Sequence, residues 1–170
     1  MRGKDKKLII PLMLMIGLLL LFGCNSKNDE ENNTISITEK QTEYLNTNNY
    51  DIVKSNGITE TYILQKNILT EQPHNIIWGV QNLNPQDYLG KTIDVSSYLV
   101  SNHKLDSYGD KGQTHLWLLI CEEEIIGGYS FPNNTETLYG GIYSLDGMTL
   151  EEITGLDFQT WSEDWMNKYK

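Results

Sequence analysis

The stretch Thr114-His-Leu-Trp-Leu-Leu-Ile-Cys121, with Glu122-Glu-Glu124 and Ile125-Ile-Gly-Gly-Tyr-Ser-Phe131 after it, decides the fold. The first run is the most apolar segment outside the N-terminus, and the second follows after only three glutamates. Two apolar runs with so short a polar connection predict a central β-hairpin. The pair Gly127-Gly128 inside the second strand predicts a bulge or the close approach of another backbone.

Further strands are predicted on both sides of this hairpin. Residues 58–64 are rich in residues of high β-propensity, and residues 91–100 alternate between two faces with a period of two, as in a half-buried strand. Residues 139–144 predict another strand. Residues 75–81 are a further apolar run, and residues 101–113 form a polar loop.

Short helices are predicted from capping residues. Asn84 before Pro85 suits a very short helix, and Thr149 with Glu152 makes a capping box for another. Asp157 begins a last helix with an apolar face at spacings of three and four, formed by Phe158, Trp161, Trp165 and Met166 or Tyr169. The predicted fold class is α+β, an antiparallel sheet of four to five strands with short C-terminal helices packed on it.

The N-terminus has the pattern of an export signal. Residues 2–7 are basic, and an uncharged apolar run of 15 residues follows, from Leu8 to Phe22. This length is typical of a signal peptide and is short for a permanent membrane span, which needs about 20 residues. The run ends at Gly23-Cys24, and the next nine residues are all polar.

Leu21-Phe22-Gly23-Cys24 resembles the lipobox of bacterial lipoproteins, although Phe22 stands where a smaller residue is more usual. The resemblance implies that a diacylglycerol is attached to the Cys24 thiol and that the signal is cleaved between Gly23 and Cys24. The two acyl chains of this diacylglycerol, for example palmitate, give stable membrane attachment where one chain is marginal. We therefore expect a lipid-anchored protein on the extracytoplasmic face of the cell membrane, whose partner at the anchor is the membrane itself.

The charge distribution supports a division of the chain into three parts. Residues 1–23 are the predicted lipoprotein signal peptide, residues 24–49 a flexible polar tether, and residues 50–170 a single small α+β domain. Within the tether, a short helix over residues 38–45 is the alternative. The formal net charge of -10 combines +3 in the signal with -13 in the remainder, which contains no arginine. An acidic domain without arginine excludes an electropositive surface for nucleic acid.

A second resemblance concerns residues 90–147, which loosely resemble an uncharacterised domain of lipoproteins from Gram-positive bacteria. It is carried by Tyr88-Leu-Gly-Lys91, the two apolar strands, Ile125-Ile-Gly-Gly128 and Leu145-Asp-Gly147. The resemblance implies no activity, and it supports the prediction of a sheet.

Residues for catalysis or metal binding are sparse. The histidines His74, His103 and His115 occur without H-E-x-x-H or C-x-x-C spacing, and no G-x-S-x-G or glycine-rich phosphate loop is present. We expect His115 to be partly buried with a satisfied ring, His103 to be solvated in its loop, and Cys121 to be buried with a raised thiol pKa. Residues 106–112 are expected to form a surface loop and not a calcium site. No catalytic residue, cofactor or metal ligand is therefore predicted.

These observations favour a non-catalytic domain that binds an envelope protein or a wall component. The candidate contact residues are tyrosines near strand faces or loops, namely Tyr98, Tyr108, Tyr129, Tyr139 and Tyr143. One alternative is a cell-envelope hydrolase that uses carboxylates or histidine, and another is a structural or regulatory subunit of a membrane complex. A pocket that unites His103 or His115 with an acid and a nucleophile would favour the hydrolase.

Overall fold

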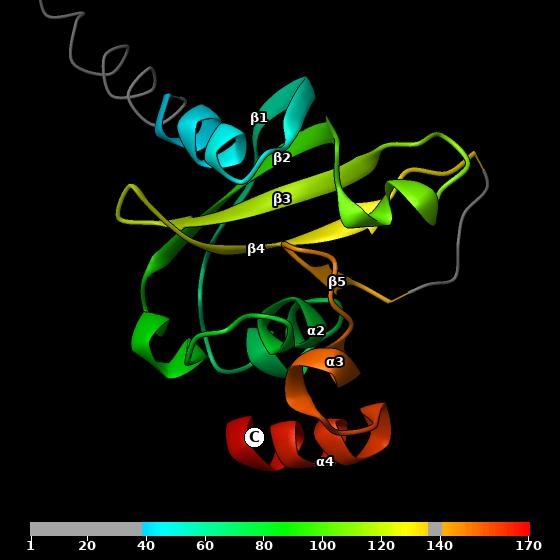
Figure 1. The fold of residues 1–170 in the computed structure, drawn as a ribbon. Helices are drawn as coiled ribbons and strands as arrows, with labels where there is room; N and C mark the ends of the chain where they lie inside the picture. The colour runs from blue at the N-terminus through cyan, green and yellow to red at the C-terminus, as the bar shows by residue number, and fades with distance from the viewer. Residues whose placement is uncertain (1–38, 136–140) are drawn as a thin grey trace, which may run out of the picture. The chain divides into compact units, whose positions relative to one another are not determined.

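A computed structural model describes residues 39–135 and 141–170. These residues contain a five-stranded antiparallel sheet in which each strand pairs with the next one along the chain. The predicted α+β class is confirmed (Figure 1). The strands are β1 (Asp51–Ile63), β2 (Thr92–Ser101), β3 (Thr114–Cys121), β4 (Glu124–Pro132) and β5 (Tyr143–Ser144).

Helices lie on both sides of the sheet. A helix over residues 39–47 lies on one side, and the helices over residues 74–79, 150–154 and 158–169 lie on the opposite side (Figure 1). The apolar run at residues 75–81 folds as a helix and not as part of the sheet. The helices are α2 (His74–Gly79), α3 (Leu150–Thr154) and α4 (Phe158–Tyr169), and the 3-10 helices are η1 (Ile68–Thr70), η2 (Pro85–Tyr88) and η3 (Lys104–Ser107).

The central hairpin is the one that the sequence predicts. Strand β3 has the predicted bounds, and the turn places Glu122 and Glu123 at φ of 52° and 66°, as a two-residue hairpin turn requires. The register between β3 and β4 shifts after Leu119, which confirms a bulge near the glycine pair. A Cβ on Gly127 would lie 2.3 Å from Gln81 Oε1, and one on Gly128 would lie 2.3 Å from the Trp117 carbonyl oxygen. The absence of a side chain at Gly127 therefore permits the close approach of the Gln81 side chain, and at Gly128 that of the β3 backbone.

Strand β3 is buried on both of its faces. The α2 face of the sheet carries buried Leu119 and Cys121 and packs against Trp78 of α2 and Tyr169 of α4. The opposite face packs against Leu45 of the residue 39–47 helix, through Tyr98, Val100, Leu116, Leu118 and Ile120. The predicted C-terminal helices cover only one of these faces, and the residue 39–47 helix covers the other, so both apolar faces of β3 are packed against helices.

The predicted tether at residues 24–49 is wrong in its last part. Residues 39–47 are helical, Leu45 is fully buried, and the buried side chain of Gln41 accepts a hydrogen bond from the Tyr98 hydroxyl. The folded part therefore includes residues 39–49 and does not begin at residue 50. Leu45 and Gln41 secure this segment through contacts with distant strands, which its polar composition does not indicate. The remainder of the predicted tether, and the predicted signal, lie outside the described residues.

A buried amide joins α2 to the sheet. Gln81 Nε2 donates to the Ile77 carbonyl at 2.5 Å and to the Gly128 carbonyl at 2.9 Å, and Gln81 Oε1 accepts from the Gly128 backbone N–H at 2.9 Å. The side chain thus pairs with both backbone groups of Gly128, in the way that a neighbouring strand would. Because the amide is buried and fully used, it fixes α2 against β4.

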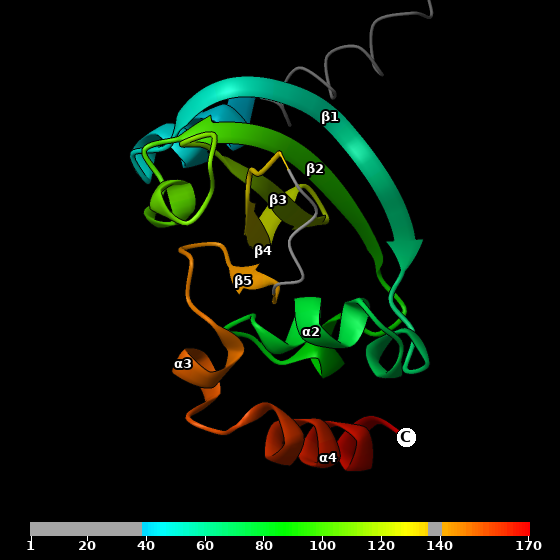
Figure 2. The same cartoon turned by 90° about the vertical axis from the view of Figure 1, so that its right-hand side faces the viewer.

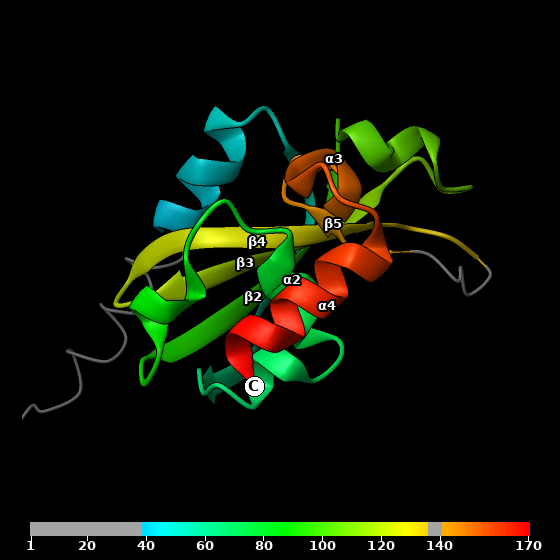
Figure 3. The same cartoon turned by 90° about the horizontal axis from the view of Figure 1, so that it is seen from below.

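The C-terminal helices begin and end as predicted. Thr149 and Glu152 form a reciprocal capping box, Gly155 ends α3 at φ 70°, and Asp157 caps α4. Trp161 and Tyr169 of α4 are buried, and Figure 3 shows α4 lying beneath α2. Part of the predicted aromatic stripe is therefore in the core, whereas Phe158 at its start is exposed.

Strand β1 is longer than the predicted strand at residues 58–64 and forms an edge of the sheet. It arches along β2 (Figure 2), and its pairing with β2 shifts register at three places, after Ile52, Ser55 and Ile58. Such bulges increase twist and protect an exposed edge from pairing with other chains. The bulges also interrupt the alternation of side chains between the two faces over residues 51–57. This explains why the sequence pattern predicts only the second half of β1.

Gly79 offers a test of the packing between α2 and α4. A Cβ at this position would lie 2.4 Å from Trp161 Cζ2 and 3.2 Å from Leu150 Cδ1. We expect Gly79→Ala to lower the free energy of unfolding by about 1–3 kcal/mol through overpacking, although alanine is otherwise the better helix former. Urea denaturation measures this difference. Gly141→Ala is the matched control, since its Cβ would meet nothing within 4 Å, and an equal effect of both changes would contradict the packing.

Candidate functional site

A stacked pair of aromatic rings lies in the middle of the α2 face of the sheet. Trp117 on β3 and Tyr129 on β4 are directly opposite in register, and their rings are 4.9 Å apart at an angle of 7°. His115, two residues before Trp117, adds a third ring at 5.8 Å from the indole. All three residues are half-buried, so each keeps some surface exposed to solvent.

Polar groups from β1 and α2 join this stack. Glu60 and Tyr62 pair with residues of β2 that belong to the same face of the sheet. The imidazole of His74 on α2 lies 3.5 Å from Glu60 Oε1, and its ring meets the Tyr62 ring edge-on at 5.1 Å. We call this group of six residues the aromatic face: Glu60, Tyr62, His74, His115, Trp117 and Tyr129.

Both phenols of the aromatic face are held in the neutral form. Burial raises the pKa of Tyr62 to about 12, against a lowering effect of the hydrogen bond from Trp78 Nε1. Burial also raises the pKa of Tyr129, and the negative charge of Glu60 raises it further. Glu60 acts on Tyr129 although β1 and β4 are not neighbours in the sheet, because the sheet curves (Figure 2). The tyrosines can therefore stack and hydrogen-bond, and they do not supply a phenolate base.

His103 does not lie where the sequence predicts. It is only 5% exposed, and it caps η3 with Nδ1 accepting from the Leu105 N–H at 3.0 Å. Nε2 lies 2.9 Å from the Leu145 carbonyl and must carry the hydrogen, so both ring nitrogens are bound to backbone groups. The prediction of a solvated His103 is wrong, because these contacts bury the ring beside Tyr50, 5.1 Å away.

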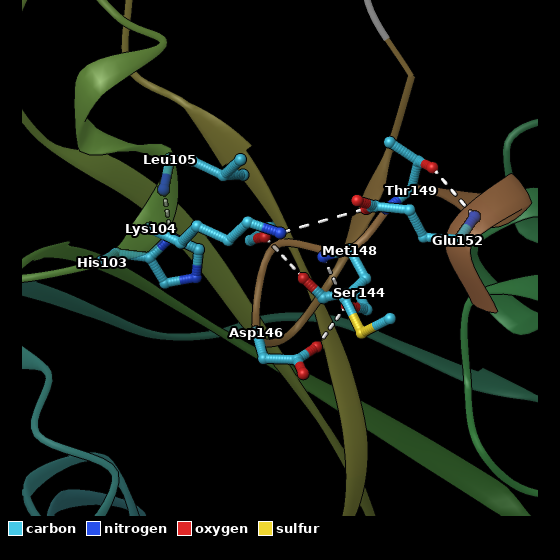
Figure 4. A network of polar contacts seen from close by, with 9 residues as sticks. His103, Lys104, Leu105, Ser144, Asp146, Met148, Thr149 and Glu152 are labelled. Carbon is cyan, nitrogen blue, oxygen red and sulfur yellow. Dashed lines mark hydrogen bonds and ion pairs between the residues drawn. The ribbon is translucent and has the colours of Figure 1, made fainter.

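The polar network around His103 is structural. The Ser144 hydroxyl bonds to the Asp146 carboxylate and accepts from the Met148 N–H, which fixes the turn after β5 (Figure 4). Lys104 Nζ lies 4.0 Å from Glu152 Oε2, and this carboxylate also accepts from the Thr149 N–H. The network thus joins η3, the turn after β5 and α3.

The other two histidines contact an amide and a carboxylate. His115 Nε2 lies 3.3 Å from Asn133 Oδ1, and His74 contacts Glu60. Within residues 39–135 and 141–170, no hydrogen bond joins a histidine ring to a serine, threonine or cysteine side chain. A site that unites His103 or His115 with an acid and a nucleophile, which would favour a hydrolase, is therefore not found in this part of the chain.

Cys121 is buried and its thiol is unreactive in character. It is 4% exposed and unpaired, and burial raises its thiol pKa, with the adjacent Glu122 raising it further. The sequence predicts this burial and this direction of the pKa shift.

In the loop with Asp106 and Asp110, both carboxylates accept hydrogen bonds from groups of the protein itself. Asp106 accepts from the His103 N–H and the Thr114 hydroxyl, and Asp110 accepts from the Thr135 N–H. Hydrogen bonding by the side chain and then by the backbone of Thr135 lowers the pKa of Asp110. In the described ranges no group of three or more histidine, cysteine, aspartate or glutamate residues is placed to hold a metal ion.

The five tyrosines predicted as a contact surface do not form one. Tyr98 is buried beneath the residue 39–47 helix, whereas Tyr108 is 60% exposed and lies 6.5 Å from the half-buried Tyr143. Tyr129 belongs to the aromatic face, and Tyr139 is outside the described residues. The sequence does not indicate that Glu60 and Tyr62 lie near Tyr129, or that His74 contacts both of them, because only the curved sheet brings these residues together.

The predicted lipidation site, Cys24 with Gly23 before it, also lies outside the described residues. Among the residues that the structure describes, no helix has the length and apolar character needed to span a membrane. No protein-family model matches the chain, and neither curated proteins nor solved structures give a match. The functional conclusion therefore rests on residues and geometry.

The buried His103 predicts a pH dependence of stability. Burial lowers its pKa below the ordinary 6.5, so the folded chain keeps His103 neutral where the unfolded chain takes up a proton. Its contribution to stability is full above pH 6.5 and is lost as the pH falls from 6.5 toward the lowered pKa. We expect His103→Asn, which keeps a cap acceptor, to be about 1–2 kcal/mol less stable at pH 7 through loss of the Leu145 bond.

Urea denaturation of both proteins between pH 7.5 and about pH 5 measures this dependence. The loss of stability on acidification is expected to be smaller in His103→Asn than in the wild type. Equal slopes in the two proteins would contradict a buried neutral imidazole.

Proposed function

We propose that this chain is a lipid-anchored, extracytoplasmic binding protein and that its domain is non-catalytic. The membrane attachment is inferred from the lipobox pattern at residues 21–24, and the binding role from the aromatic face. The partner is an envelope protein or a wall component, which an anchored domain meets at the membrane surface.

The observation that carries the binding role is the half-buried stack of Trp117 and Tyr129, with their rings 4.9 Å apart. Flat rings that are only partly covered offer large contact area at small conformational cost, and tryptophan and tyrosine dominate binding surfaces for this reason. Glu60 and His74 at its margin supply polar groups that orient a ligand.

The chemistry of the histidines supports binding in preference to hydrolysis. The ring nitrogens of His103 are occupied by backbone groups, and the phenols of the aromatic face are neutral. General base catalysis requires a group that can accept a proton within hydrogen-bond reach of a nucleophile. The described residues bring no such pair together through a histidine.

The anchor is tested by metabolic labelling with an alkynyl palmitate analogue in a bacterial host that processes lipoproteins. We expect the wild-type chain to be labelled and Cys24→Ala to be unlabelled, because Cys24 is the predicted acyl acceptor. Cys121→Ala is the matched control and keeps the label, since the Cys121 thiol is buried. Equal labelling of the wild type and Cys24→Ala would refute the lipoprotein assignment.

The binding role is tested with a photo-reactive phenylalanine analogue introduced at one position on intact cells. Position 115, at the edge of the aromatic face, is expected to give a reproducible cross-linked partner. Position 158, where Phe158 is 44% exposed on α4, is the control and is expected to give none. Absence of a partner at position 115, together with turnover of a wall substrate by the purified protein, would favour the envelope hydrolase instead.

A further inference from the structure

Strand β1 carries a chemically labile pair of residues at one of its bulges. Asn56-Gly57 is the only Asn-Gly pair in the chain. In such a pair the backbone nitrogen of the glycine attacks the side-chain amide carbon of the asparagine, because glycine has no Cβ to obstruct the approach. A regular strand suppresses this attack, since its ladder of hydrogen bonds holds the backbone extended. The local structure therefore decides whether the pair reacts.

The pair lies where β1 departs from a regular strand. The pairing with β2 shifts register between Ser55 and Gly57, so Asn56 is the extra residue of a bulge and has no register partner on β2. Gly57 adopts φ 69°, which is outside the extended region. Figure 2 shows β1 along the outer edge of the sheet, where β2 is its only neighbouring strand among the described residues. The restraint of a regular ladder is thus weakened at this point.

The reacting groups are accessible and weakly held. Asn56 and Gly57 are both exposed, and a Cβ on Gly57 would meet nothing within 4 Å, so the bulge leaves room for the attack. The Gly57 N–H donates to Ser55 Oγ at 3.4 Å, beyond the usual range of a hydrogen bond. Asn56 Nδ2 donates to Ser97 Oγ at 3.2 Å. Breaking this one neutral bond slows the reaction by about 2- to 10-fold and does not prevent it.

We infer that Asn56 is a site of spontaneous deamidation in the folded protein. The Gly57 nitrogen forms a bond to Asn56 Cγ, and the bond from Cγ to Nδ2 breaks. The proton of the Gly57 N–H leaves with Nδ2 as ammonia, and a cyclic succinimide remains. Water then opens one of the two ring carbonyls, so that residue 56 becomes aspartate or isoaspartate. Nothing is oxidised or reduced, and water is the only co-reactant.

The product adds one negative charge to β1, the strand that contributes Glu60 and Tyr62 to the aromatic face. It also changes the contact with Ser97, which lies opposite Trp117 in the register of β2 and β3. A carboxylate only accepts hydrogen bonds, so this contact persists only if the Ser97 hydroxyl turns to donate. Deamidation therefore alters the β1 side of the aromatic face as the protein ages.

The inference is tested on the full chain in detergent micelles, incubated at neutral pH. Peptide mass spectrometry after digestion at acidic pH, where further deamidation is slow, measures the rate at each asparagine. The same incubation in guanidinium chloride that unfolds the chain gives the rate without structure. We expect the folded rate at Asn56 to lie within about tenfold of the unfolded rate, because the bulge reacts without prior opening of β1. A folded rate further below the unfolded rate overturns the inference.

Two controls verify the assignment to this site. Asn67 is also exposed, but the bulky Ile68 follows it, and we expect it to stay intact in the folded chain. Asn56→Gln keeps a side-chain amide at the bulge, and its deamidation is expected to be lost because the attack would have to close a six-membered ring. Equal deamidation of Asn56 and Asn67, or an unchanged rate at position 56 in Asn56→Gln, would contradict the mechanism.

A last measurement separates reaction in the bulge from reaction through unfolding. Low denaturant concentrations that leave the chain folded still raise the small unfolded fraction exponentially. We expect the rate at Asn56 to stay nearly constant over this range. A rate that rises in parallel with the unfolded fraction would show that the folded protein protects Asn56, and would overturn the inference.

Discussion

The burial of β3 on both faces is the constraint on which the remaining structure depends. Leu116, Leu118 and Ile120 point to one side and Leu119 and Cys121 to the other, and all are shielded from water. Apolar surface on two sides requires two covering layers, because a single layer would leave one side exposed. The residue 39–47 helix covers one side, and α2 with α4 covers the other.

A few specific polar contacts orient these layers, since apolar burial by itself is non-directional. Gln81 matches both backbone groups of Gly128 and so sets the position of α2 on β4. His103, after β2, and Tyr50, just before β1, both donate to the Leu145 carbonyl and so join both segments to the turn after β5. These buried groups have few alternative partners, which makes the arrangement specific.

The aromatic face lies beside α2. It lies where Trp117 and Tyr129 are only partly covered. At such margins aromatic rings keep an accessible side while the core holds them rigidly. The acidic, arginine-free domain further restricts its ligands to those that need few cationic contacts.

The sequence by itself determined the local features: the hairpin at residues 114–131, the caps at Thr149 and Asp157, and the burial of Cys121. These depend on periodicity, turn chemistry and neighbours within a few residues. Only the tertiary structure decided that residues 39–49 are folded, that His103 is buried, and that Glu60 lies near Tyr129. Each of these features depends on contacts between residues tens of positions apart, such as His103 and Leu145. The local sequence pattern does not indicate such contacts.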